Sequence, residues 1–201
     1  MAESKTSVCN LALARLGGRR INDFDDNSES NLESIYCRLF FEETAKALLK
    51  DHYWPFAKTR VQLSQTTTPA WQYDYAYLLP TDFLRVVCVY NGADNILGRT
   101  ENSYEIEGKT LLTDEDEIYL KYIKYVDDVG AWDALFTEVF ILVLAKKLVI
   151  PLSQDVKIKM DLDRDLAILL PKVRAMDRQE EFVEGRQDLR PWKEGRSSDT
   201  A

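Results

Sequence analysis

The chain has 201 residues and a mass of 23.2 kDa, which suffices for one domain of ordinary size or for a core with one substantial insertion. Apolar residues make up 45% and charged residues 30%, the proportions of a globular protein rather than of a disordered chain. The formal charge of -8 argues against a protein whose main task is to grip nucleic acid, because phosphate binding relies on clustered Lys and Arg.

The N-terminal segment predicts a helix that begins near Ser4 or Thr6 and ends at Gly17 and Gly18, a strong C-terminal signal. The apolar residues of this helix share one face: Val8, Leu11, Ala12 and Leu16.

A second helix is predicted to follow a polar turn. Ser30 and Glu33 form a capping box at its start, the helix runs to about Lys50, and Pro55 ends it. Its apolar residues recur at helical spacing: Leu32, Ile35, Leu39, Ala47 and Leu48.

Residues 57–126 change to the two-residue period of β-strands, with β-branched and aromatic enrichment. Four alternating aromatic residues predict an extended segment with one aromatic face, closed by Leu79 and Pro80: Trp71, Tyr73, Tyr75 and Tyr77. Further strands are predicted over residues 84–90, 103–106, 110–112 and 118–126. A tight turn at Glu107 and Gly108 joins the middle two.

Helical periodicity returns at Trp132 or Asp133 and continues to Ile150, where Pro151 breaks it. Ser153 is expected to cap a last long helix, which Pro171 should kink. The apolar residues of this amphipathic helix are Val156, Met160, Leu162, Leu166, Leu169, Val173 and Met176. Residues 184–201 are polar and aperiodic and predict an extended arm.

Targeting, membrane and disulfide signals are missing from the sequence. The longest apolar run, residues 139–145, is far shorter than the ~20 residues that cross a bilayer, so we expect a buried helix there. Polar residues follow Met1, which indicates a protein made and folded in the cytoplasm. Cys9, Cys37 and Cys88 form no C-x-x-C pair, and we expect each to be a reduced, small core residue.

Residues with catalytic or metal-binding potential occur without the partners that such chemistry needs. His52 is the only histidine and lies in an aromatic cluster at a helix end, which favours packing over acid-base catalysis. The spacing of Asp23, Asp25 and Asn27 imitates the start of a calcium loop. That loop needs glycine at its sixth position and glutamate at its twelfth, where this chain has serine, so a solvated acidic turn is expected. Neither a cofactor nor a metal is predicted.

Acidic residues elsewhere also favour structural roles. Residues 114–117 (DEDE) are expected to form a solvated hairpin tip that resists strand-edge pairing. Asp161, Asp163 and Asp165 are expected on the wet face of the last helix. The many carboxylates single out no pair for glycoside cleavage.

Several motifs together resemble the tail tubular protein A family, the head-to-tail adaptors of short-tailed phages. The motifs are residues 9–17 (CNLALARLG), 52–57 (HYWPFA) and 71–86 (WQYDYAYLLPTDFLRV), followed by residues 119–123 (YLKYI) and the helix over 135–148. Their order and spacing carry the resemblance, which covers residues 7–180.

The resemblance implies an α+β fold, in which an antiparallel helical bundle carries an inserted β-rich unit and an extended C-terminal arm. The bundle would comprise residues 1–56 and 128–183, the β-rich unit residues 57–127, and the arm residues 184–201. It also implies a structural, non-enzymatic role, with about twelve copies in a ring between the portal protein and the tail nozzle. The protein would act at the head-tail junction of the virion, after assembly in the host cytoplasm.

DNA would pass through the centre of such a ring without specific binding, and an acidic wall suits that passage because it repels phosphate. The arm would dock into the portal or a neighbouring subunit through four residues: Leu189, Arg190, Pro191 and Trp192. A C-terminus that frays is the alternative.

Two other functions fit parts of the sequence. One is a non-catalytic binding module that uses the aromatic face of residues 71–77 as a ligand platform. The other is a virion-associated peptidoglycan hydrolase, which rests only on the many carboxylates.

Overall fold

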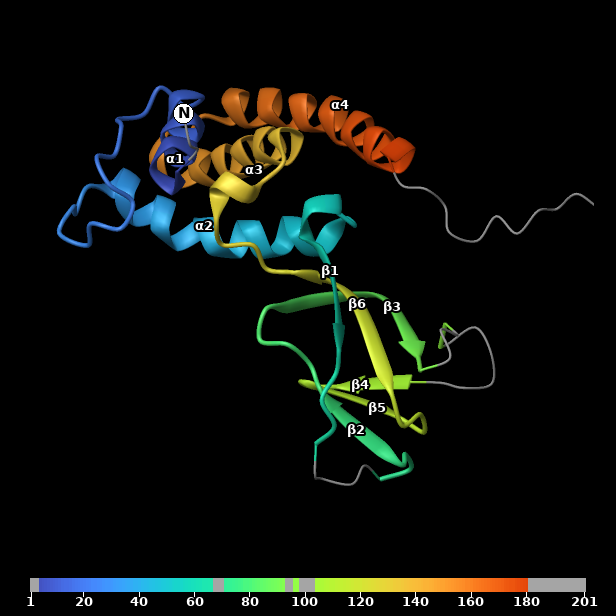
Figure 1. Ribbon diagram of the computed structural model, residues 1–201. Coiled ribbons are helices and arrows are strands. Elements are labelled where there is room, and N and C mark those ends of the chain that lie inside the picture. The colour runs from blue at the N-terminus through green and yellow to red at the C-terminus, as the bar shows by residue number, and fades with distance from the viewer. Residues whose placement is uncertain (1–3, 67–70, 93–95, 98–103, 181–201) are drawn as a thin grey trace, which may run out of the picture.

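The computed structural model describes residues 4–66, 71–92, 96–97 and 104–180. The described part of the chain folds into four α-helices and two small antiparallel sheets, with the helices gathered at one end and the strands at the other (Figure 1). The helices are α1 (Lys5–Ala14), α2 (Leu32–Asp51), α3 (Ala134–Leu152) and α4 (Val156–Glu180). The strands are β1 (Lys58–Gln62), β2 (Tyr75–Leu78), β3 (Phe83–Asn91), β4 (Tyr104–Glu107), β5 (Thr110–Thr113) and β6 (Ile118–Lys124).

The first helix has the predicted start and stop. Ser4 Oγ accepts a hydrogen bond from the Ser7 N–H at 3.1 Å, and Ser7 Oγ accepts one from the Ser4 N–H at 2.9 Å. After the helix, Gly17 adopts a φ of +67°, and the Gly18 N–H donates to the Leu13 carbonyl at 3.0 Å. The left-handed backbone at Gly17 therefore ends the helix in the way that glycine favours.

The predicted capping box of the second helix is wrong. Asn31, rather than Ser30, caps α2, because its Oδ1 accepts a hydrogen bond from the Ser34 N–H at 2.7 Å. The Ser34 hydroxyl donates to the Glu29 carbonyl at 2.7 Å, which ties the helix to the preceding loop. Glu33 lies in the first turn, where its charge complements the helix dipole without closing a capping box.

The last two helices also depart from the prediction at their ends. Asp155, rather than Ser153, caps α4, since its Oδ1 accepts from the Lys157 N–H at 2.7 Å. Pro151 lies inside the last turn of α3, which therefore extends beyond the predicted break. Proline has no N–H, so it cannot donate to the Lys147 carbonyl four residues earlier, and the last turn of α3 lacks that hydrogen bond. Pro171 lies inside a continuous α4, and the kink expected there stays a prediction.

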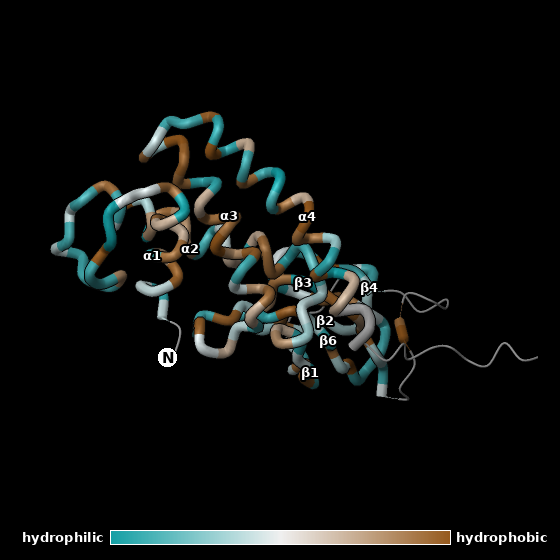
Figure 2. Tube along the Cα trace, turned by 90° about the horizontal axis from the view of Figure 1, so that it is seen from above, coloured by the Kyte–Doolittle hydropathy of each residue, from teal (hydrophilic) through white to brown (hydrophobic). Residues whose placement is uncertain are grey.

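The core of the helical end is built around α3. This helix contacts α1, α2 and α4, and it lies between α2 and α4 (Figure 1). Figure 2 shows α3 as largely hydrophobic, whereas hydrophilic and hydrophobic residues alternate along α4. Aromatic rings fill the interior, with ring centroids 4.9 Å apart for Trp54 and Phe136 and 4.8 Å apart for Trp132 and Phe140.

The strands form two sheets with a second core between them. One sheet has the strand order β1-β6-β3 and the other β2-β5-β4. The Thr66 N–H donates to the Ala76 carbonyl at 2.8 Å, so the segment that follows β1 joins the two sheets at one side. The fully buried residues of this core include Leu111, Ile118 and Leu120.

The predicted strands over residues 84–90, 103–106, 110–112 and 118–126 are confirmed with shifts of a few residues at their ends. Gly108 occupies the predicted tight turn with a φ of +58°, the conformation that a two-residue hairpin requires at this position.

Candidate functional site

The apolar stripe that the sequence places on α2 lies largely on the surface. Leu32, Ile35 and Leu39 are 59%, 42% and 61% exposed, and their spacing puts them on one side of the helix. The face that α2 buries is formed instead by Cys37, Phe41, Ala45, Leu48 and Leu49. Exposed apolar side chains in a contiguous row indicate a surface that meets another protein. We call Leu32, Ile35 and Leu39 the α2 stripe.

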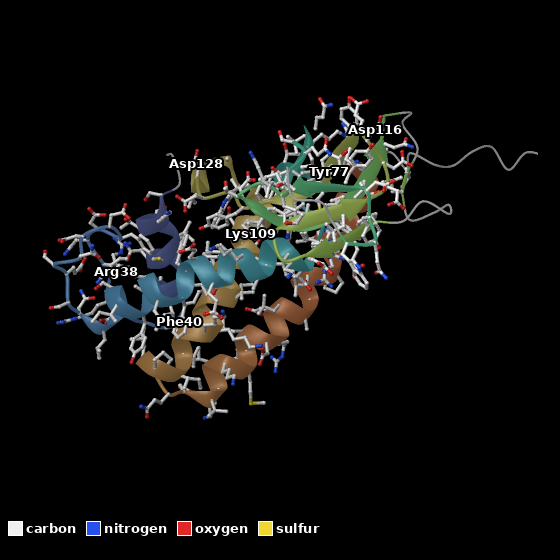
Figure 3. All side chains as sticks on the ribbon, turned by 90° about the horizontal axis from the view of Figure 1, so that it is seen from below. Arg38, Phe40, Tyr77, Lys109, Asp116 and Asp128 are labelled. Atoms are coloured by element: carbon white, nitrogen blue, oxygen red, sulfur yellow. The ribbon has the colours of Figure 1, made fainter. Side chains whose placement is uncertain are left out.

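A second set of exposed apolar residues lies on α4. Leu162, Leu166 and Val173 are buried, as the amphipathic pattern predicts. Val156, Met160 and Met176 belong to the same predicted face but are exposed, so the prediction is wrong for these three, and Ile168 is exposed as well. Because α3 separates α2 from α4, the two helices expose their outer sides in different directions (Figures 1 and 3). The helical end therefore exposes apolar side chains on two helices, as a row on α2 and at scattered positions of α4.

The helices are also linked by charged side chains. Arg174 of α4 forms an ion pair with Asp51 of α2. Asp163, predicted to be on the wet face of α4, is half-buried and pairs with Lys146 of α3. Asp161 and Asp165 are exposed, as predicted.

A polar depression of about 210 Å³ lies where α1, α2 and the chain after β6 meet. It is lined by Lys5, Phe24, Asp25, Asn27, Arg38, Phe41, Glu42, Tyr125 and Asp127. The Lys5 ammonium lies 2.7 Å from the Asp127 carboxylate, and its hydrogen bond holds the pKa of that carboxyl below the usual range. Arg38 donates to the carbonyls of Asp26 and Glu29, each at 2.9 Å. Arg38 therefore ties the loop before α2 to this helix, and the Lys5–Asp127 pair joins α1 to the chain after β6.

The calcium-like loop uses its acidic side chains in local turns. Asp23 Oδ1 accepts from the Asp25 N–H at 3.1 Å, and Asp26 Oδ1 accepts from the Ser28 N–H at 2.8 Å. Across the described ranges, no group of three or more His, Cys, Asp or Glu side chains is arranged to hold a metal ion. The hydrogen bonds of Asp23 and Asp26 are those of the acidic turn expected from the sequence.

The histidine and two of the cysteines are integrated into the packing. His52 ends α2, and its ring meets the Trp54 ring edge-on at a centroid distance of 5.0 Å. Cys9 and Cys37 are buried, and hydrogen bonding to Cys37 together with burial raises the pKa of the Cys9 thiol. A thiol with a raised pKa is a poor nucleophile at neutral pH. All three cysteines are free, as predicted, but Cys88 is only half-buried, so the core position expected for it is wrong.

The predicted aromatic platform is wrong. Trp71 is 84% exposed and lies in a turn, while Tyr77 is buried between the sheets. Gln72 has a φ of +72°, so the chain turns there instead of continuing as a strand. Only Tyr75 and Tyr77 belong to β2, and Tyr73 lies before it. The four rings therefore do not share one face.

The acidic hairpin tip is partly solvated and partly anchored. Asp114 and Asp116 are exposed, as expected, and Asp116 lies at the far end of the β unit (Figure 3). Glu117 Oε1 accepts from the Gln62 amide at 2.8 Å and from the Tyr119 hydroxyl at 2.7 Å. These bonds fix the tip against β1 and β6.

Buried tyrosine makes the stability of the fold sensitive to alkali. Burial, aided by the hydrogen bond that the Tyr122 hydroxyl donates to Asp82 at 2.9 Å, raises the pKa of Tyr122 from 10.0 to about 12. The unfolded chain releases this proton more readily, so the contribution of Tyr122 is complete below pH 10 and is lost as the pH rises to 12. We expect Tyr122→Phe to lower the free energy of unfolding by about 1 kcal/mol at pH 7. Urea unfolding from pH 7 to 12 should show a shallower alkaline decline for this variant than for the wild type, and an equal decline would contradict the assignment.

The predicted docking residues of the arm lie outside the described residues: Leu189, Arg190, Pro191 and Trp192. Among the helices that the structure describes, none combines the length and the apolar character needed to cross a membrane.

Comparison with known proteins adds no relative to this description. No protein-family model matches the sequence, and a search of curated proteins found no significant match.

Proposed function

We propose that this protein is a structural adaptor at the head-tail junction of a short-tailed phage, where copies of it form a ring between the portal protein and the tail nozzle. The observation that carries the proposal is the pair of exposed apolar surfaces on α2 and α4, which point in different directions. A ring subunit needs two different surfaces, because each copy meets one neighbour on either side. A ring of about twelve copies follows from the family resemblance.

The arrangement of the helices supports the bundle expected of such an adaptor. Glu43 of α2 lies 3.4 Å from Lys147 of α3, and Trp54 after α2 packs on Phe136 near the start of α3. These contacts are those of two helices that run in opposite directions. All six strands lie between residues 58 and 124, which agrees with one β unit inserted between α2 and α3.

The charge of the chain supports passage of DNA rather than its capture. A formal charge of -8 gives the ring an acidic character, and fixed negative charge repels phosphate. In this proposal the protein joins surfaces and catalyses no reaction, and it acts in the virion after assembly in the host cytoplasm.

Imaging of the protein mixed with its portal protein tests the proposal. Electron cryomicroscopy should show a symmetric, stoichiometric ring of this chain bound to the portal. Portal particles without a bound ring, at protein concentrations well above those in a host cell, would refute the adaptor function.

The arm gives a second test of portal attachment. We expect deletion of residues 185–201 to leave the protein folded but to weaken its attachment to the portal, because Trp192 is the proposed anchor. Circular dichroism would verify the fold, and sedimentation with portal particles would measure attachment. Trp192→Ala should reproduce most of the loss, whereas normal attachment of the truncated protein would show that the arm is dispensable.

A further inference from the structure

The outer face of the β1-β6-β3 sheet is rich in positive charge. Residues opposite each other in an antiparallel sheet share a face, and Leu120 and Tyr122 of β6 point into the core between the sheets. The residues that alternate with them therefore point away from that core. They form three rows across β1, β6 and β3: Gln62, Tyr119 and Tyr90; Arg60, Lys121 and Cys88; Lys58, Ile123 and Arg85.

The helical end covers the third of these rows. Ile123 is buried in the helical core, and Arg85 donates to the Lys50 carbonyl at 3.1 Å while its guanidinium lies 4.4 Å from the centre of the Tyr53 ring. The rows farther from the helices are more accessible, since Arg60 and Gln62 are exposed and Tyr119 is 36% exposed.

The middle row places two like charges side by side. Arg60 lies directly opposite Lys121, an arrangement that destabilises an isolated sheet. Neither side chain forms an ion pair with a described residue. Glu117 lies at the end of this face, and its carboxylate accepts hydrogen bonds from Gln62 and Tyr119. An anionic partner would offset the repulsion between Arg60 and Lys121.

The outer face of the β2-β5-β4 sheet has the opposite charge. Tyr77, Leu111 and Ile106 point into the core, so the alternating residues point outward. They form two rows across β2, β5 and β4: Ala76, Leu112 and Glu105; Leu78, Thr110 and Glu107.

Glutamate supplies the only charges in these two rows. Glu105 and Glu107 are exposed, the Tyr73 hydroxyl donates to Glu105 at 3.2 Å, and Leu78 is 57% exposed. Lys109, in the turn between β4 and β5, is the cation adjoining this face. Ala76 and Leu112 of the same face are buried, so its exposed residues are Glu105, Glu107 and Leu78.

We propose that the cationic face of one copy, centred on Arg60 and Lys121, docks on the acidic face of the next copy, centred on Glu105 and Glu107. This inference rests on the proposed ring assembly and identifies a contact within it. The two faces belong to different sheets with the second core between them, so one copy cannot bring them together. Two different, complementary faces produce head-to-tail association, which closes into a ring when the rotation permits.

A second copy fits the cationic face better than nucleic acid does. The chain itself supplies the complementary surface, whereas a charge of -8 opposes the approach of DNA. Charge complementarity of this kind sets the register of docking and makes association sensitive to salt.

Charge reversal tests the contact. One variant carries Arg60→Glu and Lys121→Glu, and a second carries Glu105→Lys and Glu107→Lys. Each variant alone presents two faces of the same sign, so we expect its self-association, measured by sedimentation, to weaken about tenfold or more relative to the wild type. An equimolar mixture of the two should regain association, because each reversed face then meets a face of opposite sign.

The control variant carries Arg19→Glu and Arg20→Glu, which makes the same change in charge as the first variant, on an exposed loop after α1. It should associate like the wild type, and thermal unfolding should show that all variants are folded. Self-association of the single variants at wild-type strength, or failure of the mixture to regain it, would overturn the inference. The inference would also be overturned if the wild type bound a short DNA duplex, the first variant did not, and mixing the two variants did not restore the binding. That result would assign the face to nucleic acid.

The outcome is separable from that of the adaptor function. If the wild type forms its ring on the portal and both reversed variants do so equally well, the contact is wrong and the adaptor function stands. If the wild type forms no ring on the portal, the adaptor function fails. In that case the inference is still tested by the free proteins at about 1 mM. It holds if the single variants lose self-association and their mixture regains it.

Discussion

Phe136→Ala is expected to lower the free energy of unfolding by about 4 kcal/mol, which is a large fraction of the stability of a typical domain. Phe136 is fully buried, and its ring lies 4.9 Å from those of Trp54 and Trp132 and 5.0 Å from that of Phe56, centroid to centroid. Its removal leaves a cavity that these large, mutually packed rings cannot fill by small shifts. Urea unfolding followed by circular dichroism measures the loss, and the midpoint of thermal unfolding should fall by roughly 8 to 16 °C.

Trp71→Ala is the matched control for this prediction. It removes a larger aromatic side chain that is 84% exposed, and we expect a change of about 0.5 kcal/mol or less. Equal destabilisation by the two substitutions would mean that the aromatic cluster around α3 is not the main source of stability.

The sequence predicts the order of elements well because turn and capping signals are local. Gly17 stops α1 through a left-handed backbone conformation that glycine adopts readily, and Gly108 marks a hairpin for the same reason. Caps are harder to assign when several suitable residues are adjacent. Asn31 and Asp155 cap their helices because the path of the chain brings their side chains to the first N–H groups of the helix. The serines nearby have side chains that can form the same hydrogen bond, so the sequence alone does not distinguish between them.

Burial is harder to predict than periodicity. The alternation of aromatic residues before Tyr77 has the period of a strand, yet Gln72 turns the chain and leaves Trp71 on the surface. On α2, an apolar pattern at helical spacing identifies an amphipathic helix without showing which stripe is covered. Cys37 and Phe41 face the core, and the leucines of the α2 stripe face solvent.

The candidate surfaces depend on pairings between distant segments. Arg60 and Lys121 are neighbours only because β1 pairs with β6 in one register, and a shift by one residue would turn either side chain to the other face. The sequence shows the charges of both strands but carries no direct signal for that register. The opposite charges of the two outer β faces could therefore be found only from the structure.

Leu39→Glu is expected to reduce ring assembly about 100-fold while leaving the subunit folded. Leu39 is 61% exposed in the isolated chain, so glutamate there costs the fold little. In the proposed ring, the α2 stripe is buried against a neighbouring copy. An unpaired carboxylate in such an apolar interface costs about 3 kcal/mol or more. Sedimentation of the free protein and imaging of portal complexes would measure the loss.

Ala47→Glu provides the control, because it adds the same charge at an exposed position of α2 beyond the stripe. We expect this variant to assemble normally, and Leu39→Met to assemble nearly as well as the wild type since it keeps an apolar side chain of similar volume. If Leu39→Glu forms complete rings, the α2 stripe is not a contact between copies, and the exposed apolar residues of α2 and α4 no longer support the ring. If Ala47→Glu and Leu39→Glu fail alike, added negative charge on α2 explains the loss, and the apolar character of the stripe does not.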